Sequence, residues 1–367
     1  MARVGGLDSI RFVCAFIVVL FHFGLVSRAT FGTDPRGLAA VSRAVLGCLF
    51  DGPAAVIVFF VISGFCIHFP FRQDPAVNIS SYYSRRLIRI GVPALVALCL
   101  WTWVGVKLEP QDAGIFWSII CEVEYYLLYP VLLRLRLRFG WWSLIVVSQV
   151  LAYILALSHI PDIQRVVGSY PAFGWCNWVI GLPCWLLGCW LADVFEQFPQ
   201  PSATLIWLSR VGIFVLSAML QALRFHGGSV YLSNAFTLNL FAVPACFWLG
   251  LEIAYRRKTP APAVLEWAGK WSYSLYLMHP VVSGLLSMSI WLLPDLSSSA
   301  GNLVPIFGSL LIAYGFYLVI EAPAHRFAIA VSRRLKPTTP QRHSRSQILN
   351  FPDLNEIDCI MCNLEFR

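Results

Sequence analysis

Long apolar runs separated by short polar segments make up most of the chain. A helix needs roughly 20 apolar residues to cross the hydrocarbon core of a bilayer, and about ten runs approach that length. They lie at about residues 7–26, 46–69, 84–104, 113–134, 140–158, 173–194, 203–223, 231–254, 271–293 and 302–331. Several contain Pro or Gly, which membrane helices tolerate. The pattern therefore predicts an all-α fold, a polytopic membrane helical bundle of about ten transmembrane helices.

The distribution of Lys and Arg orients the predicted bundle. An even number of spans puts both termini on one side, and that side carries most of the basic residues. Its basic residues are Arg3, Arg72, Arg85, Arg86, Arg89, Arg134, Arg136, Arg138, Arg256, Arg257, Lys258, Arg333, Arg334 and Lys336. The opposite side holds Arg28, Arg36, Arg43, Lys107, Arg165 and Arg224. Because positive residues favour the cytoplasm, both termini are predicted to be cytoplasmic, in a multi-pass protein of the inner or plasma membrane.

Two regions differ in composition. Residues 1–336 form the predicted transmembrane domain, whereas residues 337–367 are polar and irregular. We expect the second region to be a disordered cytoplasmic tail. The longer predicted outer loops lie at about residues 27–45 and 159–172.

Composition excludes several classes of protein. Of the 367 residues, 58% are hydrophobic and only 13% are charged, which excludes an ordinary soluble domain. The net charge of +8 is carried by short loops between apolar runs, so it indicates membrane topology, not nucleic-acid binding. The single CxxC of Cys359 and Cys362 has no second pair with which to complete a zinc site. The sequence therefore predicts no metal and no tightly bound cofactor.

Ionisable side chains inside the first predicted span are the first candidates for function, since such groups are costly in a membrane. Arg11 and His22 differ by only about 20° around the helix axis and by about 16 Å along it. Two interpretations stay open. Arg11 could extend to the interface while His22 bonds a neighbouring carbonyl, or both could face a functional cavity.

The fourth predicted span carries a polar face. Ser118, Glu122 and Tyr126 repeat at helical spacing. Glu122 could be a structural carboxylate that bonds a neighbouring helix. Alternatively, with the orientation above, it could meet His22 in the outer half of the membrane and orient it as a base.

Two further groups of polar residues lie in the third and ninth predicted spans. Arg86 and Arg89 share a helix face, where they could anchor to lipid headgroups or bind the phosphates of an anionic cosubstrate. Tyr276 and His279 share a face of the ninth span, where Tyr could anchor at the interface and His could cap backbone freed by Pro. Glu321 would be a helix-packing or Arg-pairing group.

Several segments, in the same order along the chain, resemble motifs of the membrane-bound acyltransferase 3 family. They lie at residues 6–23, 59–65, 85–93, 117–130, 272–279 and 321–323, and include the pairing of Arg11 with His22 and the sequence Ser272-Tyr273-Ser274-Leu275-Tyr276. The resemblance runs from about residue 6 to residue 326, nearly the whole predicted membrane part.

The resemblance implies an O-acyltransferase that uses acyl-CoA, usually acetyl-CoA, as cosubstrate from the cytoplasm. The acceptor would be a hydroxyl of a cell-surface polysaccharide, a lipopolysaccharide or another glycan or lipid-linked molecule. It implies that His22 is the catalytic imidazole, assisted by Glu122, and that Arg11, Arg86 and Arg89 face the CoA phosphates. The supporting or substrate-binding residues would be Ser118, Tyr126, Tyr273, Tyr276, His279 and Glu321. Direct transfer and a covalent acyl-enzyme both stay open.

One other function fits the same residues. A proton-coupled transporter of a polar solute or acyl group would also place a buried His and Glu in the membrane as a proton relay. The absence of a detectable internal repeat in the sequence disfavours this alternative.

Overall fold

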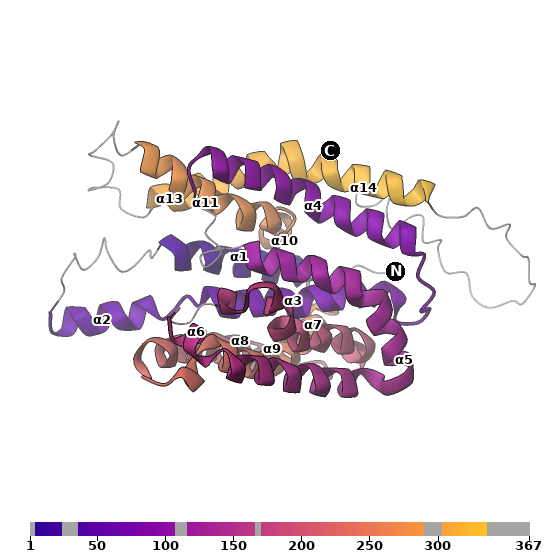
Figure 1. Ribbon diagram of the computed structural model, residues 1–367, viewed down its shortest axis with the longest axis horizontal. Helices are drawn as coiled ribbons and strands as arrows, with labels where there is room; N and C mark the ends of the chain where they lie inside the picture. The colour runs from indigo at the N-terminus through magenta and orange to yellow at the C-terminus, as the bar shows by residue number, and fades with distance from the viewer. Residues whose placement is uncertain (1–3, 24–35, 107–115, 166–169, 290–302, 336–367) are drawn as a thin grey trace, which may run out of the picture.

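The computed structural model describes residues 4–23, 36–106, 116–165, 170–289 and 303–335 (Figure 1). All regular structure within these ranges is helical. The longer helices are α1 (Leu7–Phe23), α3 (Gly52–His68), α4 (Ile79–Trp103), α5 (Phe116–Ser158), α7 (Asn177–Val194), α8 (Ala203–His226), α9 (Asn234–Arg256), α11 (Ser272–Ser289), α13 (Leu303–Phe316) and α14 (Ala322–Arg334). Shorter elements are α2 (Leu38–Gly47), α6 (Ile160–Arg165), α10 (Ala263–Gly269), the 3₁₀ turns η1 (Phe69–Phe71), η3 (Tyr170–Cys176), η4 (Phe195–Gln197) and η5 (Val230–Leu232), and the π-turn η6 (Tyr317–Glu321).

Helix occupies most of every predicted apolar run, which confirms the all-α prediction. Within the described ranges, 7 helices are long and apolar enough to cross a membrane by length and composition. With 17 residues, α1 is about 25 Å long and falls just short of that length. The number of crossings and the side of each terminus stay predictions, and residues 337–367 lie outside the described ranges.

The chain reverses direction inside α5. Gly140 has φ 77° and ψ 165°, a conformation that needs glycine, and it divides the element into two helices. Trp142 packs on Trp190 near the end of α7, whereas His159 packs on Phe173 just before α7 begins. The second half of α5 therefore runs antiparallel to α7. Two predicted spans, 113–134 and 140–158, are joined without an intervening loop.

Two short helices were missed, and one predicted span begins late. The sequence placed a loop at about residues 27–45 and a span from residue 46, but α2 ends at Gly47 and α3 begins only at Gly52. Local sequence sets the start of α3. Asp51 is its N-cap and accepts a hydrogen bond from the Ala54 amide at 3.1 Å, and Pro53 lies in the first turn. Similarly, α10 occupies a segment predicted as a loop.

The bundle has two groups of helices with α1 and α3 between them (Figure 1). On one side lie α4, α11, α13 and α14, and on the other lie α5, α7, α8 and α9. Gly64 of α3 and Gly188 of α7 face each other's backbones so closely that a Cβ at either position would overlap a carbonyl oxygen. Small residues permit such contacts between membrane helices.

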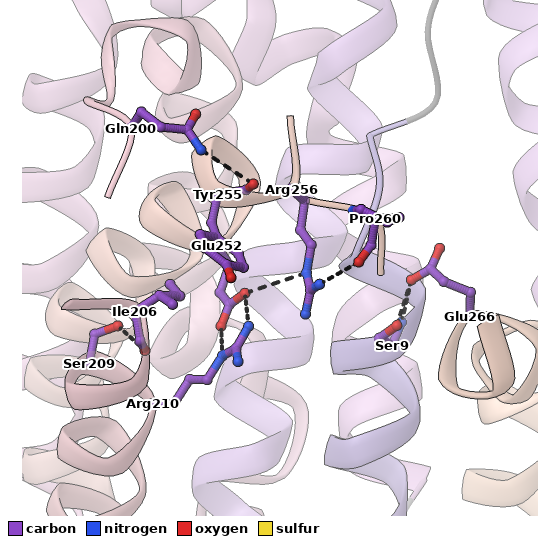
Figure 2. Close-up of polar contacts among 10 residues, drawn as sticks. All are labelled: Ser9, Gln200, Ile206, Ser209, Arg210, Glu252, Tyr255, Arg256, Pro260 and Glu266. Atoms are coloured by element: carbon purple, nitrogen blue, oxygen red, sulfur yellow. Dashed lines mark hydrogen bonds and ion pairs between the residues drawn. The ribbon is translucent and has the colours of Figure 1, made fainter. Parts of the chain in front are cut away.

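Ion pairs and a cap fix the helix ends next to the N-terminus (Figure 2). The Glu252 carboxylate of α9 accepts two hydrogen bonds from Arg210 of α8, at 2.5 and 3.0 Å. The Arg256 Nε lies 3.9 Å from the Glu252 Oε2. The Glu266 carboxylate accepts from the Ser9 amide at 3.0 Å and from its hydroxyl at 2.6 Å. A carboxylate from α10 thus caps the first turn of α1, where a negative charge is favourable.

Candidate active site

A cavity lies between the two groups of helices. Its empty volume is about 1000 Å³, part of it open to solvent, and its walls come from α1, α3, α4, α5, α10, α11 and η6. The polar residues that line it are Arg11, Ser63, Cys66, Arg86, Arg89, Ser118, Glu122, Tyr126, Lys270, Ser272, Tyr273, Tyr276 and Glu321. Every site residue predicted from the sequence is in this set except His22 and His279.

Glu122 is held on the wall of the cavity by two hydroxyls. The Tyr126 hydroxyl, one turn along α5, donates to its carboxylate at 2.5 Å, and the Ser63 hydroxyl of α3 donates at 2.9 Å. Trp185 of α7 in turn donates to the Ser63 oxygen at 3.3 Å. Three helices thus fix one carboxylate, whose position is set before any ligand enters.

Basic side chains dominate another wall. Arg11 donates to Asp8 at 3.3 Å and to the Cys66 sulfur at 3.4 Å. Arg86 and Arg89 are half-buried and, among the residues that the structure describes, they have no hydrogen-bond or ion-pair partner. Lys270 adds a fourth cation that the sequence analysis did not single out. Guanidinium groups without acceptors in a partly desolvated cavity favour an anionic ligand.

Tyrosines of α11 join the neighbouring helices around the cavity. The Tyr276 hydroxyl hydrogen-bonds the Ser118 hydroxyl at 2.7 Å, and the Tyr273 hydroxyl donates to the Ile90 carbonyl at 3.1 Å. The first contact connects α11 to α5 and the second connects it to α4. These residues therefore connect the walls of the cavity, and the supporting role expected of them stays a prediction.

Glu321 lies in a π-turn at the edge of the same cavity. Pro323 lacks an amide hydrogen, so it cannot continue the regular helical hydrogen bonding of α13 and the backbone widens before it. The Glu321 carboxylate accepts from the Ser274 amide at 3.1 Å and from the Ser274 hydroxyl. Glu321 was predicted to be a helix-packing or Arg-pairing group. Its hydrogen bonds go to Ser274 of α11, and it is attracted by Arg89 and Arg11 without a direct ion pair among the described residues.

His22 and His279 form a pair away from the cavity wall. Their ring centroids are 5.0 Å apart. The His22 side chain is exposed, whereas His279 is buried, and its Nδ1 donates to the Leu275 carbonyl at 3.3 Å. The His279 Nε2 is buried and has no hydrogen-bond partner in the described ranges. With Nδ1 as donor, a neutral His279 carries its free lone pair on Nε2.

The predicted pairing of His22 with Glu122 is not formed. His22 is one residue from the end of α1, whereas Glu122 lies about 9 Å along α5 from its first residue. Arg11 contacts Cys66 and Glu122 contacts Ser63, and these two partners are one turn apart on α3. Along the axis of the bundle, Glu122 therefore lies closer to Arg11 than to His22. The neighbour of His22 is His279.

A second buried network was missed. His68 is fully buried between the Tyr129 hydroxyl and the Asp193 carboxylate, each at 2.9 Å. Asp193 also accepts from Arg136 at 2.6 Å and from Trp141 at 2.8 Å. A His and an Asp within predicted spans were the available signal. Because each of these contacts is satisfied and none of the residues lines the cavity, the network stabilises the packing of α3, α5 and α7.

Comparisons with known proteins agree with this arrangement. A family model described as an acyltransferase domain matches residues 4–320, which include all of the cavity residues before Glu321. The acyltransferase MdmB of Streptomyces mycarofaciens is 24% identical over 328 residues, which cover 77% of this chain and 79% of that protein. No solved structure matches the chain.

Proposed function

The chain belongs to the acyltransferase 3 family and is a membrane acyltransferase, and on this premise we propose that it moves an acyl group from acyl-CoA to a hydroxyl of a cell-surface glycan or lipid-linked acceptor. Acetyl-CoA is the donor that we expect. The proposed location is the inner or plasma membrane, with the donor entering from the cytoplasm.

The observation that carries this proposal is the pair Arg86 and Arg89, which have no hydrogen-bond or ion-pair partner among the residues that the structure describes. Arg86 and Arg89 line a cavity together with Arg11 and Lys270, against only two carboxylates. A diphosphate with an additional phosphate, as in CoA, matches such a surface because each guanidinium can donate two parallel hydrogen bonds to phosphate oxygens. A neutral donor would leave the excess of positive charge over Glu122 and Glu321 without compensation.

The proposed reaction centre is the exposed face of His22. The His22 imidazole takes the proton of the acceptor hydroxyl as the oxygen attacks the thioester carbonyl. The carbon–sulfur bond then breaks, and the proton passes from His22 to the CoA thiolate, so that an ester and free CoA are the products. His22 lies about 16 Å along α1 from Arg11, a distance that the extended pantetheine arm of CoA has to bridge.

His279 replaces Glu122 as the proposed partner of His22. Its ring lies 5.0 Å from that of His22 and is fixed through Nδ1, and its buried Nε2 has no hydrogen-bond partner in the described part of the chain. It would orient His22 or the attacking hydroxyl. Glu122 is then proposed to hold the polar part of the donor within the cavity.

The proton-coupled transporter considered above is not supported by the family assignment, since the family is one of enzymes. A transporter would move its solute without forming a new covalent product. Product formation therefore distinguishes the two functions.

The test is transfer of label from radioactive acetyl-CoA by the purified protein, with membrane glycan extract as acceptor. We expect His22→Ala to reduce transfer to the level without enzyme while the amount of protein in the membrane stays unchanged. His159→Ala is the matched control, since His159 packs against Phe173 outside the cavity. More than a few per cent of wild-type transfer in His22→Ala would exclude His22 as the base.

A further inference from the structure

Buried polar atoms without partners cluster where α1 ends and α3 begins. They are Asp51 Oδ2, Gln221 Oε1, and the Nε and Nη1 atoms of Arg224. The three side chains are 2%, 1% and 9% exposed. None of the four atoms has a hydrogen-bond partner among the described residues. Such atoms are costly to bury unless another molecule completes their hydrogen bonds.

The three residues lie together and are fixed by their other polar groups. The Gln221 amide nitrogen donates to the carbonyls of Gly47 at 2.9 Å and Phe50 at 3.3 Å, directly before Asp51. Asp51 uses its other oxygen to cap α3. Arg224 is three residues after Gln221 on the same face of α8 and is attracted by the Asp51 charge, although the two form no direct ion pair.

The cluster adjoins the proposed reaction centre. The Arg224 guanidinium lies 5.8 Å from the Phe21 ring and 4.2 Å from the Phe225 ring. Phe21 directly precedes His22 and packs so closely on Gly52 that a Cβ there would come within 2.7 Å of its ring. His22 and the cluster are thus at the same end of the bundle, opposite the arginines of the cavity.

We propose that Asp51, Gln221 and Arg224 form a binding site for the acceptor, and that this site takes neighbouring hydroxyl groups of a carbohydrate or polyol. This inference rests on the proposed function. A hydroxyl both donates and accepts, so one can donate to Asp51 or Gln221 while another accepts from Arg224. A free anion would be repelled by Asp51 and a cation by Arg224, whereas a neutral polyhydroxyl group satisfies both. The rings of Phe21 and Phe225 provide apolar surface for the carbon–hydrogen face of a sugar.

The experiment compares two alcohols as acceptors of label from acetyl-CoA, using the full-length protein in lipid nanodiscs. Methyl α-D-glucopyranoside has several neighbouring hydroxyls, and cyclohexanol has one. For Arg224→Gln and Gln221→Met we expect the apparent KM for the glucoside to rise about tenfold or more, as for lost hydrogen bonds to a charged or buried group. The apparent KM for acetyl-CoA and the transfer to cyclohexanol should stay within about twofold of wild type.

Arg210→Gln is the matched control, because Arg210 is on the same helix but pairs with Glu252. It should lower the melting temperature without changing the KM for the glucoside. If Arg224→Gln and Gln221→Met behave in the same way, the cluster is structural and filled by water, and the inference is overturned.

A binding measurement separates this inference from the proposed function. Excess methyl α-D-glucopyranoside should raise the melting temperature of the wild-type protein without acetyl-CoA, and should not raise that of Arg224→Gln. Absence of any His22-dependent transfer would contradict the proposed function alone. Absence of the thermal shift, or an equal shift in both proteins, would contradict the acceptor site whether or not transfer occurs.

Discussion

At the residue scale, some charged side chains of the cavity have hydrogen-bond or ion-pair partners within the described part of the protein, and others have none. Glu122 and Glu321 receive hydrogen bonds from hydroxyls and an amide, and Arg11 is paired with Asp8. Arg86 and Arg89 have no such partner in the described ranges. Arg89 is attracted by Glu321 but repelled by Arg11 and Arg86, so positive charge exceeds negative charge in the cavity. Binding of a polyanion removes the remaining repulsion.

Arg86→Gln should therefore weaken donor binding more than it slows the chemical step. We expect the apparent KM for acetyl-CoA to rise about tenfold, in line with a charged hydrogen bond, while kcat stays within about twofold. Steady-state kinetics at two salt concentrations provide the measurement, since screening should weaken donor binding in the wild type and less so in the variant. Arg134→Gln removes an exposed arginine of α5 outside the cavity and is the control. An unchanged KM with a lower amount of protein would favour lipid anchoring.

The identity of the cavity residues was accessible from the sequence, but their pairing was not. Polar groups within apolar runs have to face an interior, and this rule selected Arg11, Glu122 and Glu321. Which groups meet depends on where each helix begins relative to its neighbours, and periodicity does not specify that offset. The sequence therefore paired His22 with Glu122 and missed its contact with His279.

At the element scale, the contact between α3 and α7 depends on the absence of two side chains. A Cβ on Gly188 would overlap the Val61 carbonyl, and one on Gly64 would overlap the Trp185 carbonyl. Backbone carbonyls cannot move aside as a flexible side chain can. The sequence shows each glycine, but it does not predict that the two helices pack against each other at these positions.

Gly188→Ala should consequently destabilise the protein. Overpacking typically costs about 1–3 kcal/mol, and we expect the upper part of that range because the overlap is with backbone. Gly212→Ala on α8 is the control, since a Cβ there meets nothing within 4 Å, and it should be neutral or slightly stabilising. The stability of both variants is measured by thermal unfolding in detergent, with the fraction of monodisperse protein as the readout. Equal melting temperatures for the two variants would contradict the close contact.

At the scale of the whole molecule, the apolar pattern predicted the helical bundle well because span length is set by bilayer thickness. Each of the predicted runs is mainly helix. The amphipathic α2 and the short α10 were not predicted, since neither is long enough to produce a span signal. The grouping of helices around α1 and α3 depends on packing between distant segments and was not accessible from the sequence.

The orientation of the bundle gives a prediction for the whole chain. With both termini cytoplasmic, alkaline phosphatase fused to the C-terminus should be inactive and green fluorescent protein fused there should fluoresce. The same reporters inserted after Gly228, in the predicted outer loop that follows Arg224, should give the opposite result. Active phosphatase at the C-terminus would reverse the assignment of the arginine-lined cavity to the cytoplasmic side.

The reversal of α5 at Gly140 has a consequence for how the protein reaches the membrane. The first half carries Glu122 and Glu124 within its apolar run, and a charged side chain at mid-membrane costs about 3 kcal/mol on insertion scales. The second half, residues 141–158, has no charged residue at all. With no loop between them, the halves cannot be delivered separately. We expect the first half to wait at the insertion machinery until the second has been synthesised, so that the two enter the bilayer as one helical hairpin.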